Sequence, residues 1–136
     1  MAILGRQQQL EARLTSNERA GLYAFVDRLH QRYGEDLLRV RLFGSKARGD
    51  FHDESDLDLR VVVRMTEGAY RRYWREIVDL SAQVGLEYSF VTLLVIKDEP
   101  RYARMCQHRL LLARNIERDG IDLWTKQPSE LTFAPA

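Results

Sequence analysis

The segment from Leu42 to Val63 constrains the fold of this chain more than any other. It reads LFGSKARGDFHDESDLDLRVVV. An apolar run ends at Phe43, Gly44-Ser45 interrupts it, a loop rich in Gly, Asp and Ser follows, and a second apolar run opens at Asp56. This order predicts a strand, a tight turn, a polar loop and a second strand.

Two carboxylates open the second run. Side chains alternate along a strand, so Asp56 and Asp58 project from one side and the apolar residues between and after them project from the other. At roughly 6 Å and an effective dielectric near 20, their repulsion costs about 3 kcal/mol, so a cation is expected between them. Mg²⁺ binds through one or two carboxylates together with substrate phosphates. The pair therefore predicts a divalent-metal site.

Gly44 and Ser45 supply features that suit a phosphate. Glycine has no Cβ to keep a ligand away from the backbone, and a serine at the start of a short helix can offer both its hydroxyl and its amide. Either motif alone is common in turns and at strand starts. Their combination, with ten residues between Ser45 and Asp56, favours a site that metal and phosphate share.

Length and composition indicate one globular domain. The chain has 136 residues, of which 45% are hydrophobic and 30% charged. We expect 1–136 to be a single domain with its core at about 15–124, and 1–14 and 125–136 to be peripheral. Cys106 is the single cysteine, which excludes an internal disulfide.

Charge and hydropathy limit the possible partners. The net charge of +1 provides no global field to recruit nucleic acid, so direct nucleic-acid binding is not expected. The sequence contains no apolar run long enough to cross a bilayer and no apolar core of a signal peptide, so a cytoplasmic protein without membrane contact is expected.

Helix and strand signals predict an α/β (α+β) fold. Thr15 and Glu18 have the spacing of a capping box, so a helix should begin there and end at Gly34. A second amphipathic helix should run from near Thr66 to Gly85, with Trp74 in its buried stripe. The remaining expected elements are strands at 37–43, 56–63, 88–96 and 121–124 and helices at 101–106 and 108–118. We expect a small mixed sheet flanked by helices, which cover one face and leave the functional edge open on the other.

The central segment resembles a known signature. Gly44-Ser45, ten residues and Asp56-x-Asp58, with Ala47-Arg48-Gly49 and Ser55 between, is similar to the motif of the nucleotidyltransferase superfamily related to DNA polymerase beta. The short chain resembles most the minimal nucleotidyltransferases, the antitoxin partners of HEPN-domain ribonuclease toxins. The resemblance covers roughly 22–123, although its specific part is 44–58.

The resemblance implies a polymerase-beta-like nucleotidyltransferase fold and an activity. The chain would transfer AMP from ATP to a hydroxyl acceptor, a tyrosine of a cognate HEPN toxin, and would associate with that toxin. Asp56 and Asp58 would be catalytic and would hold one or two Mg²⁺ ions. The nucleotide-binding residues would be Gly44, Ser45, Arg48 and Ser55.

Two points of this assignment stay open. The family has a third carboxylate on the next strand, but 88–96 contains no acid, and Glu87 at its entrance is the nearest candidate. Arg48 could clamp a phosphate or could pair with an acid of its own loop.

Two other functions are compatible with the sequence. The missing strand acid favours an antitoxin that binds nucleotide weakly or without catalysis and neutralises its partner by occlusion. The motif also occurs in small-molecule adenylyltransferases, but those carry an added helical domain.

Overall fold

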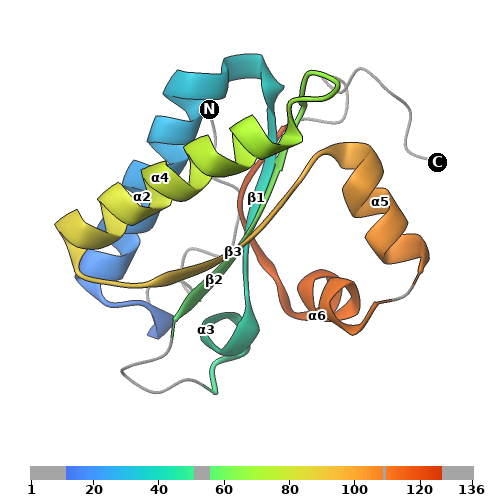
Figure 1. The fold of residues 1–136 in the computed structure, drawn as a ribbon. Coiled ribbons are helices and arrows are strands. Elements are labelled where there is room, and N and C mark those ends of the chain that lie inside the picture. The colour runs from blue at the N-terminus through green and yellow to red at the C-terminus, as the bar shows by residue number, and fades with distance from the viewer. Residues whose placement is uncertain (1–11, 51–55, 109, 127–136) are drawn as a thin grey trace.

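A computed structural model describes residues 12–50, 56–108 and 110–126 of the chain (Figure 1). The elements follow in the order α2 (Ser16–Tyr33), a 3-10 turn (Gly34–Asp36), β1 (Leu37–Phe43), α3 (Gly44–Arg48), β2 (Leu57–Val63), α4 (Tyr70–Tyr88), β3 (Thr92–Lys97), α5 (Glu99–Gln107), α6 (Leu111–Asp119) and β4 (Ile121–Thr125).

The four strands form one mixed sheet in the order β3-β2-β1-β4. β1 runs antiparallel to both β2 and β4, and β2 runs parallel to β3. The parallel pair needs a crossover connection, which α4 supplies. The expectation of a small mixed sheet flanked by helices is confirmed.

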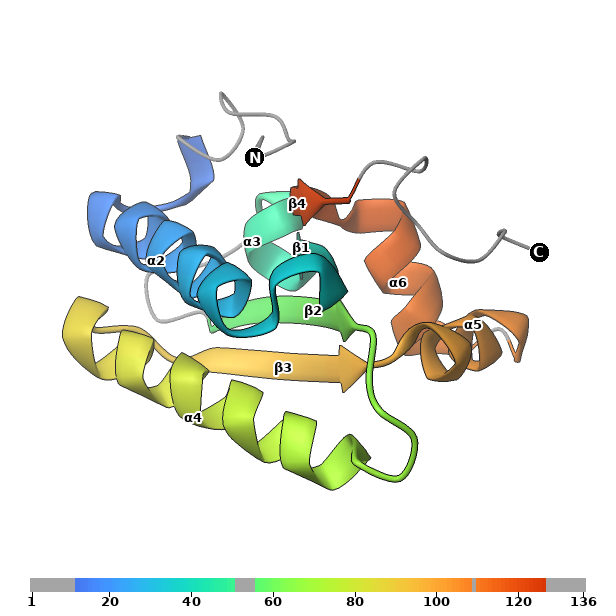
Figure 2. The same cartoon turned by 90° about the horizontal axis from the view of Figure 1, so that it is seen from above.

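Helices cover both faces of the sheet. Figures 1 and 2 show α2 and α4 on one side and α5 and α6 on the other, with α3 at one end of the strands. The expectation that helices cover one face only was therefore wrong. The second face mixes apolar residues with arginines of β1 and β2, and ion pairs from these arginines to Glu99 of α5 and Glu117 of α6 add to the apolar contacts that hold the helices there.

The larger core lies between the sheet and the helices α2 and α4. It contains the apolar residues of α2 together with the inward side chains of β1 and β2, among them Phe25, Leu29, Val40, Leu59 and Val61, each at most 1% exposed. A smaller cluster on the other face packs Tyr102 and Ile116 against Leu38 and Val62. Two cores explain how strands buried on both faces can carry nearly continuous apolar runs.

The first helix begins and ends as the sequence predicts. Thr15 accepts a hydrogen bond from the Glu18 amide at 3.1 Å, and the Glu18 carboxylate accepts one from the Thr15 amide at 2.8 Å. Gly34 caps the C-terminus of α2 with a φ of 53°. The capping box and the glycine stop are both confirmed.

The second long helix differs from its prediction. It extends through Gly85 to Tyr88, and β3 begins at Thr92 rather than at residue 88. Gly85 does not end the helix. It allows the backbone of Phe90 to approach α4 closely, because a Cβ at residue 85 would lie 2.6 Å from the carbonyl oxygen of Phe90. Trp74 is 45% exposed, so its assignment to the core was also wrong.

In the part of the chain that the structure describes, no helix is long and apolar enough to cross a membrane.

Candidate functional site

The turn after β1 and the start of β2 meet at one end of the sheet. Phe43 and Asp58 are register partners, so Gly44 lies directly beside the Asp58 side chain. Gly44 has a φ of 76°, and a Cβ built on it would lie 1.9 Å from Oδ2 of Asp58. The carboxylate therefore occupies the space that any other residue at 44 would fill.

The two carboxylates lie close enough to influence each other. Burial raises the pKa of Asp58, and the neighbouring Asp56 charge raises it further, while Arg48 opposes the shift. Asp56 is exposed and Asp58 half-buried. A desolvated acid beside a second acid is an arrangement that a cation would stabilise.

Ser45 and Lys46 occupy the first turn of α3 and have different surroundings. Ser45 is half-buried, and its carbonyl accepts the Gly49 amide at 2.8 Å. Lys46 is 2% exposed, and its ammonium pairs with Glu18 of α2 at 3.1 Å. Lys46 thus anchors α3 to α2.

Arg48 takes the second of the two roles left open by the sequence, because its guanidinium pairs with Asp50 of its own loop at 3.2 Å. A contact with phosphate stays a prediction. The charge of Arg48 also lowers the pKa of Asp58 and that of Asp119, at the end of α6, so it lies within electrostatic reach of the carboxylate pair.

Glu87 and Ser55 were also proposed as site residues. Glu87 lies in the last turn of α4 and not on the strand, and its carboxylate pairs with Arg28 of α2 at 2.7 Å. Both helices belong to the sheet face opposite the Asp58 side chain. Ser55 lies outside the described residues.

The position that faces Asp58 on β3 is apolar. Asp58 and Leu93 are register partners in the parallel pair, so their side chains share one face. Among the described residues, no group of three or more His, Cys, Asp or Glu side chains is placed to hold a metal. The described part of the site therefore offers two carboxylates.

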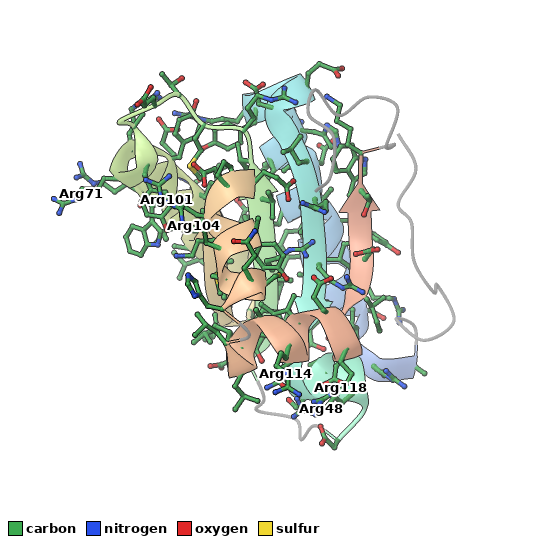
Figure 3. The ribbon with its side chains drawn as sticks, turned by 90° about the vertical axis from the view of Figure 1, so that its right-hand side faces the viewer. Arg48, Arg71, Arg101, Arg104, Arg114 and Arg118 are labelled. Carbon is green, nitrogen blue, oxygen red and sulfur yellow. The ribbon has the colours of Figure 1, made fainter. Side chains whose placement is uncertain are left out.

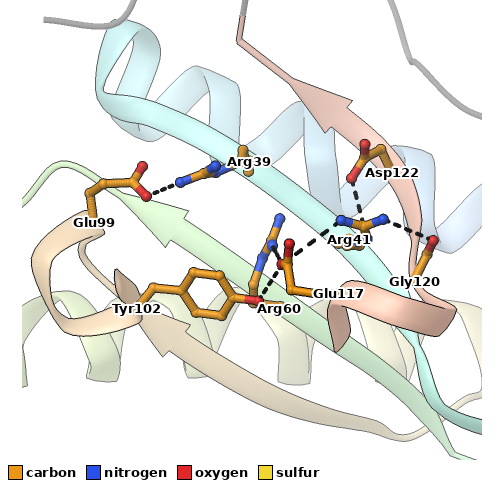
Figure 4. A network of polar contacts seen from close by, with 8 residues as sticks. All are labelled: Arg39, Arg41, Arg60, Glu99, Tyr102, Glu117, Gly120 and Asp122. Carbon is orange, nitrogen blue, oxygen red and sulfur yellow. Dashed lines mark hydrogen bonds and ion pairs between the residues drawn. The ribbon is translucent and has the colours of Figure 1, made fainter. Parts of the chain in front are cut away.

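Three arginines, Arg39, Arg41 and Arg60, lie on the same face of the sheet as Asp58 (Figure 4). The sequence did not predict their role. Arg60 is two residues beyond Asp58 and 1% exposed, and its guanidinium lies 4.9 Å from the centre of the Tyr102 ring. Glu117 of α6 accepts a hydrogen bond from the Tyr102 hydroxyl at 2.6 Å and pairs with Arg60 at 3.5 Å. Burial lowers the pKa of Arg60. The signal in the sequence was an arginine directly before three valines in β2.

A second arginine group lies at the α3 end of the sheet. In Figure 3, Arg114 and Arg118 of α6 lie near Arg48, and α3 packs against α6. Arg118 pairs with Asp119 at 2.9 Å. Of these three arginines, Arg48 is the one whose charge acts on Asp58, on the side of the site where a polyphosphate would need positive charge.

The residues present fit a divalent metal with a nucleoside triphosphate. Asp56 and Asp58 supply two carboxylates, and the glycine at 44 leaves the Asp58 carboxylate open beside the α3 backbone. A bound Mg²⁺ would neutralise phosphate charge and polarise a phosphoryl oxygen. The site thus has the parts of a metal-dependent phosphoryl-group or nucleotidyl-group transferase.

Comparison with protein families agrees with this class. Residues 22–123 match the nucleotidyltransferase domain family. The chain belongs to this nucleotidyltransferase family, and the resemblance inferred from Gly44 to Asp58 is confirmed.

A relative and two solved structures are also similar. The protein MJ0604 of Methanocaldococcus jannaschii, which is named as a candidate protein adenylyltransferase, is 30% identical over 83 residues, covering 61% of this chain and 76% of the relative. A toxin-antitoxin crystal structure with AMP-PNP has a TM-score of 0.49 at 20% identity and covers 78% of this chain and 75% of its own. A candidate nucleotidyltransferase from Sulfolobus solfataricus has a TM-score of 0.49 at 19% identity and covers 87% of both chains.

Proposed function

We propose that this nucleotidyltransferase transfers AMP from ATP to a hydroxyl of a partner protein, a tyrosine of a cognate HEPN toxin, and thereby acts as an antitoxin in the cytoplasm. The observation that carries the proposal is the contact between Gly44 and the Asp58 carboxylate, with Asp56 beside it. The protein acceptor is supported by the relative named as a candidate protein adenylyltransferase. The toxin partner follows from the resemblance to minimal nucleotidyltransferases.

In the proposed reaction the acceptor hydroxyl oxygen bonds to the α-phosphorus of ATP. The bond from this phosphorus to the bridging oxygen breaks, pyrophosphate leaves, and the hydroxyl proton passes to water beside the exposed Asp56. Asp56 and Asp58 would hold Mg²⁺, and Gly44, Ser45, Arg48 and Ser55 would contact the nucleotide. Such transfer depends mainly on positioning and charge neutralisation.

Covalent labelling tests this proposal. The purified chain, the product of the adjacent gene and ATP labelled at the α-phosphate are incubated with Mg²⁺. We expect label on the partner with the wild type and none with Asp56→Asn or Asp58→Asn. Label that persists in both variants would contradict the proposal.

A second function has its own supporting observation. β3, the strand beside Asp58, contains no acid and presents Leu93 there, and Glu87 is engaged with Arg28. These facts favour an antitoxin that binds nucleotide but neutralises its partner by occlusion. In the same assay this function predicts a stable complex without label.

A further inference from the structure

The exposed large apolar side chains of the described residues form two groups, one along the outer edge of β3 and α4 and the other at 110–112, at the start of α6. A groove of about 890 Å³ lies between this strand and α4. Its lining includes Trp74, Leu86, Val91 and Leu93, which are 45%, 86%, 65% and 55% exposed. Large exposed apolar side chains that line one groove make it a candidate binding surface.

The same edge becomes basic toward the end of β3. A smaller hollow of about 290 Å³ is lined by Lys97, Arg101, Arg104 and His108, among others. The guanidinium of Arg101 lies 4.3 Å from the centre of the Tyr70 ring at the start of α4. Figure 3 shows Arg101 and Arg104 at this end, with Arg71 projecting outward from the start of α4. The surface is therefore apolar at one end and cationic at the other.

The apolar end adjoins the carboxylate pair. Leu93 is the register partner of Asp58, and Thr92 that of Leu57, so the first residues of β3 lie one strand away from Asp56 and Asp58. β3 also forms an edge of the sheet, and its outer backbone groups face away from β2. A polypeptide seated on this edge would lie next to the site of transfer.

We propose that the outer edge of β3, with its groove against α4, is the docking surface for the protein acceptor. The acceptor segment carries apolar side chains that fill the groove beside Trp74 and Leu86. Acidic side chains follow and pair with Arg104 and with Lys97, while Arg101 is already paired with Asp98 at 2.6 Å. The inference rests on the proposed function, because it names where the acceptor binds.

Charge favours a partner over a second copy of this chain. The cationic end carries Arg71, Lys97, Arg101 and Arg104, and a two-fold pairing of β3 edges would set these cations against the apolar start of the other β3 strand. A partner with apolar and acidic side chains matches both ends of the surface. Its charge complementarity would raise the rate of association as well as the affinity.

The test measures binding between the full chain and the purified product of the adjacent gene, by calorimetry and by light scattering of the complex. Leu86→Asp places a charge in the groove, and Arg104→Glu reverses one at the basic end. The matched control is Gln83→Asp, which adds the same charge at an exposed position on α4 outside the groove. Binding of ATP with Mg²⁺ is measured on every variant.

We expect Leu86→Asp and Arg104→Glu each to weaken partner binding by at least about tenfold, as at other interface hot spots, with ATP binding unchanged. Gln83→Asp should bind as the wild type does. Equal binding by all variants, or no complex with the wild type, would overturn the inference.

Two further outcomes would also overturn it. A wild-type dimer that Leu86→Asp dissociates would assign the groove to a second copy, and a synthetic RNA whose binding depends on Arg104 would assign the basic end to nucleic acid. If both variants lose the complex but the wild type transfers no AMP to the partner, the docking surface is retained and the proposed transfer is refuted.

Discussion

Gly44 is the residue on which the geometry of the site depends most. Its φ of 76° is in the left-handed region, and a Cβ would meet the Asp58 carboxylate at 1.9 Å. Gly44→Ala should therefore displace Asp58 and weaken binding of ATP with Mg²⁺, in addition to a backbone cost of about 1 kcal/mol.

Gly68→Ala is the matched control for this change. Its φ of 79° imposes the same backbone cost, but nothing lies within 4 Å of the added Cβ. Calorimetry should show impaired nucleotide binding for Gly44→Ala alone. Equal binding by the two variants would show that the contact with Asp58 has no role in the site.

The ionised Asp58 carboxylate should lower the stability of the folded chain, although it is a proposed metal ligand. Burial and Asp56 raise its pKa, so the ionised carboxylate is disfavoured in the folded chain at any pH above that raised value. Asp58→Asn removes this cost and should raise the melting temperature at pH 7 by a small amount, on the order of 1–3 °C.

The pH dependence checks the sign of this effect. As the pH falls through the raised pKa, the wild-type carboxyl becomes protonated and the advantage of Asp58→Asn should disappear. Metal-dependent nucleotide binding of the wild type should be lost over the same interval. A variant that melts below the wild type at pH 7 would contradict this account. Asp79→Asn, at an exposed position on α4, is the control.

Among the elements, α3 depends on one buried ion pair. Lys46 and Glu18 have side chains 2% and 9% exposed, and they join α3 to α2. Lys46→Met leaves the Glu18 carboxylate without this partner and should cost about 3 kcal/mol in the free energy of unfolding, measured with urea.

The control for this pair is an exposed one. Arg72 and Glu76 lie 3.5 Å apart on α4, and the Arg72 side chain is 57% exposed. Arg72→Met should cost less than about 1 kcal/mol. Similar losses for the two variants would mean that the Lys46 pair does not anchor α3.

The strand β3 carries the clearest departure from the family pattern. Leu93 faces Asp58, and it is 55% exposed, so a polar side chain should be tolerated there. Leu93→Asp would supply a third carboxylate and should tighten Mn²⁺ binding by about tenfold, since affinity rises with the number of charged ligands.

Leu93→Asn is the neutral control for this gain. It removes the same apolar side chain without adding charge, so it should leave Mn²⁺ affinity near that of the wild type. If Leu93→Asp binds Mn²⁺ no better than Leu93→Asn does, the residue facing Asp58 does not limit the metal site.

At the scale of the whole molecule, local sequence patterns predicted the turn and the carboxylates, but they did not predict the residues that surround them. Gly44 and Asp58 lie in one segment, so turn chemistry and strand pairing were enough to bring them together, whereas Asp56 lies just before β2 rather than in the predicted strand. The buried place of Arg60 depends on α5, which carries Tyr102, and on α6, which carries Glu117, and both helices come from far along the chain. No local pattern records such a contact.

The exposed edge of β3 could not be predicted for the same reason. Trp74 has the spacing of a core residue on α4, and its exposure follows from where the sheet ends. The apolar composition of β3 is equally compatible with a central strand. Which strand lies at the edge is a property of the whole topology.

The central claim is that Asp56 and Asp58 form one site with the turn at Gly44 for a metal and a nucleoside triphosphate. Electron paramagnetic resonance of Mn²⁺, titrated with ATP and the purified chain, tests it most directly. We predict a protein-bound Mn²⁺ signal that requires ATP and is lost in both Asp56→Asn and Asp58→Asn. The same bound signal in either variant would contradict the claim.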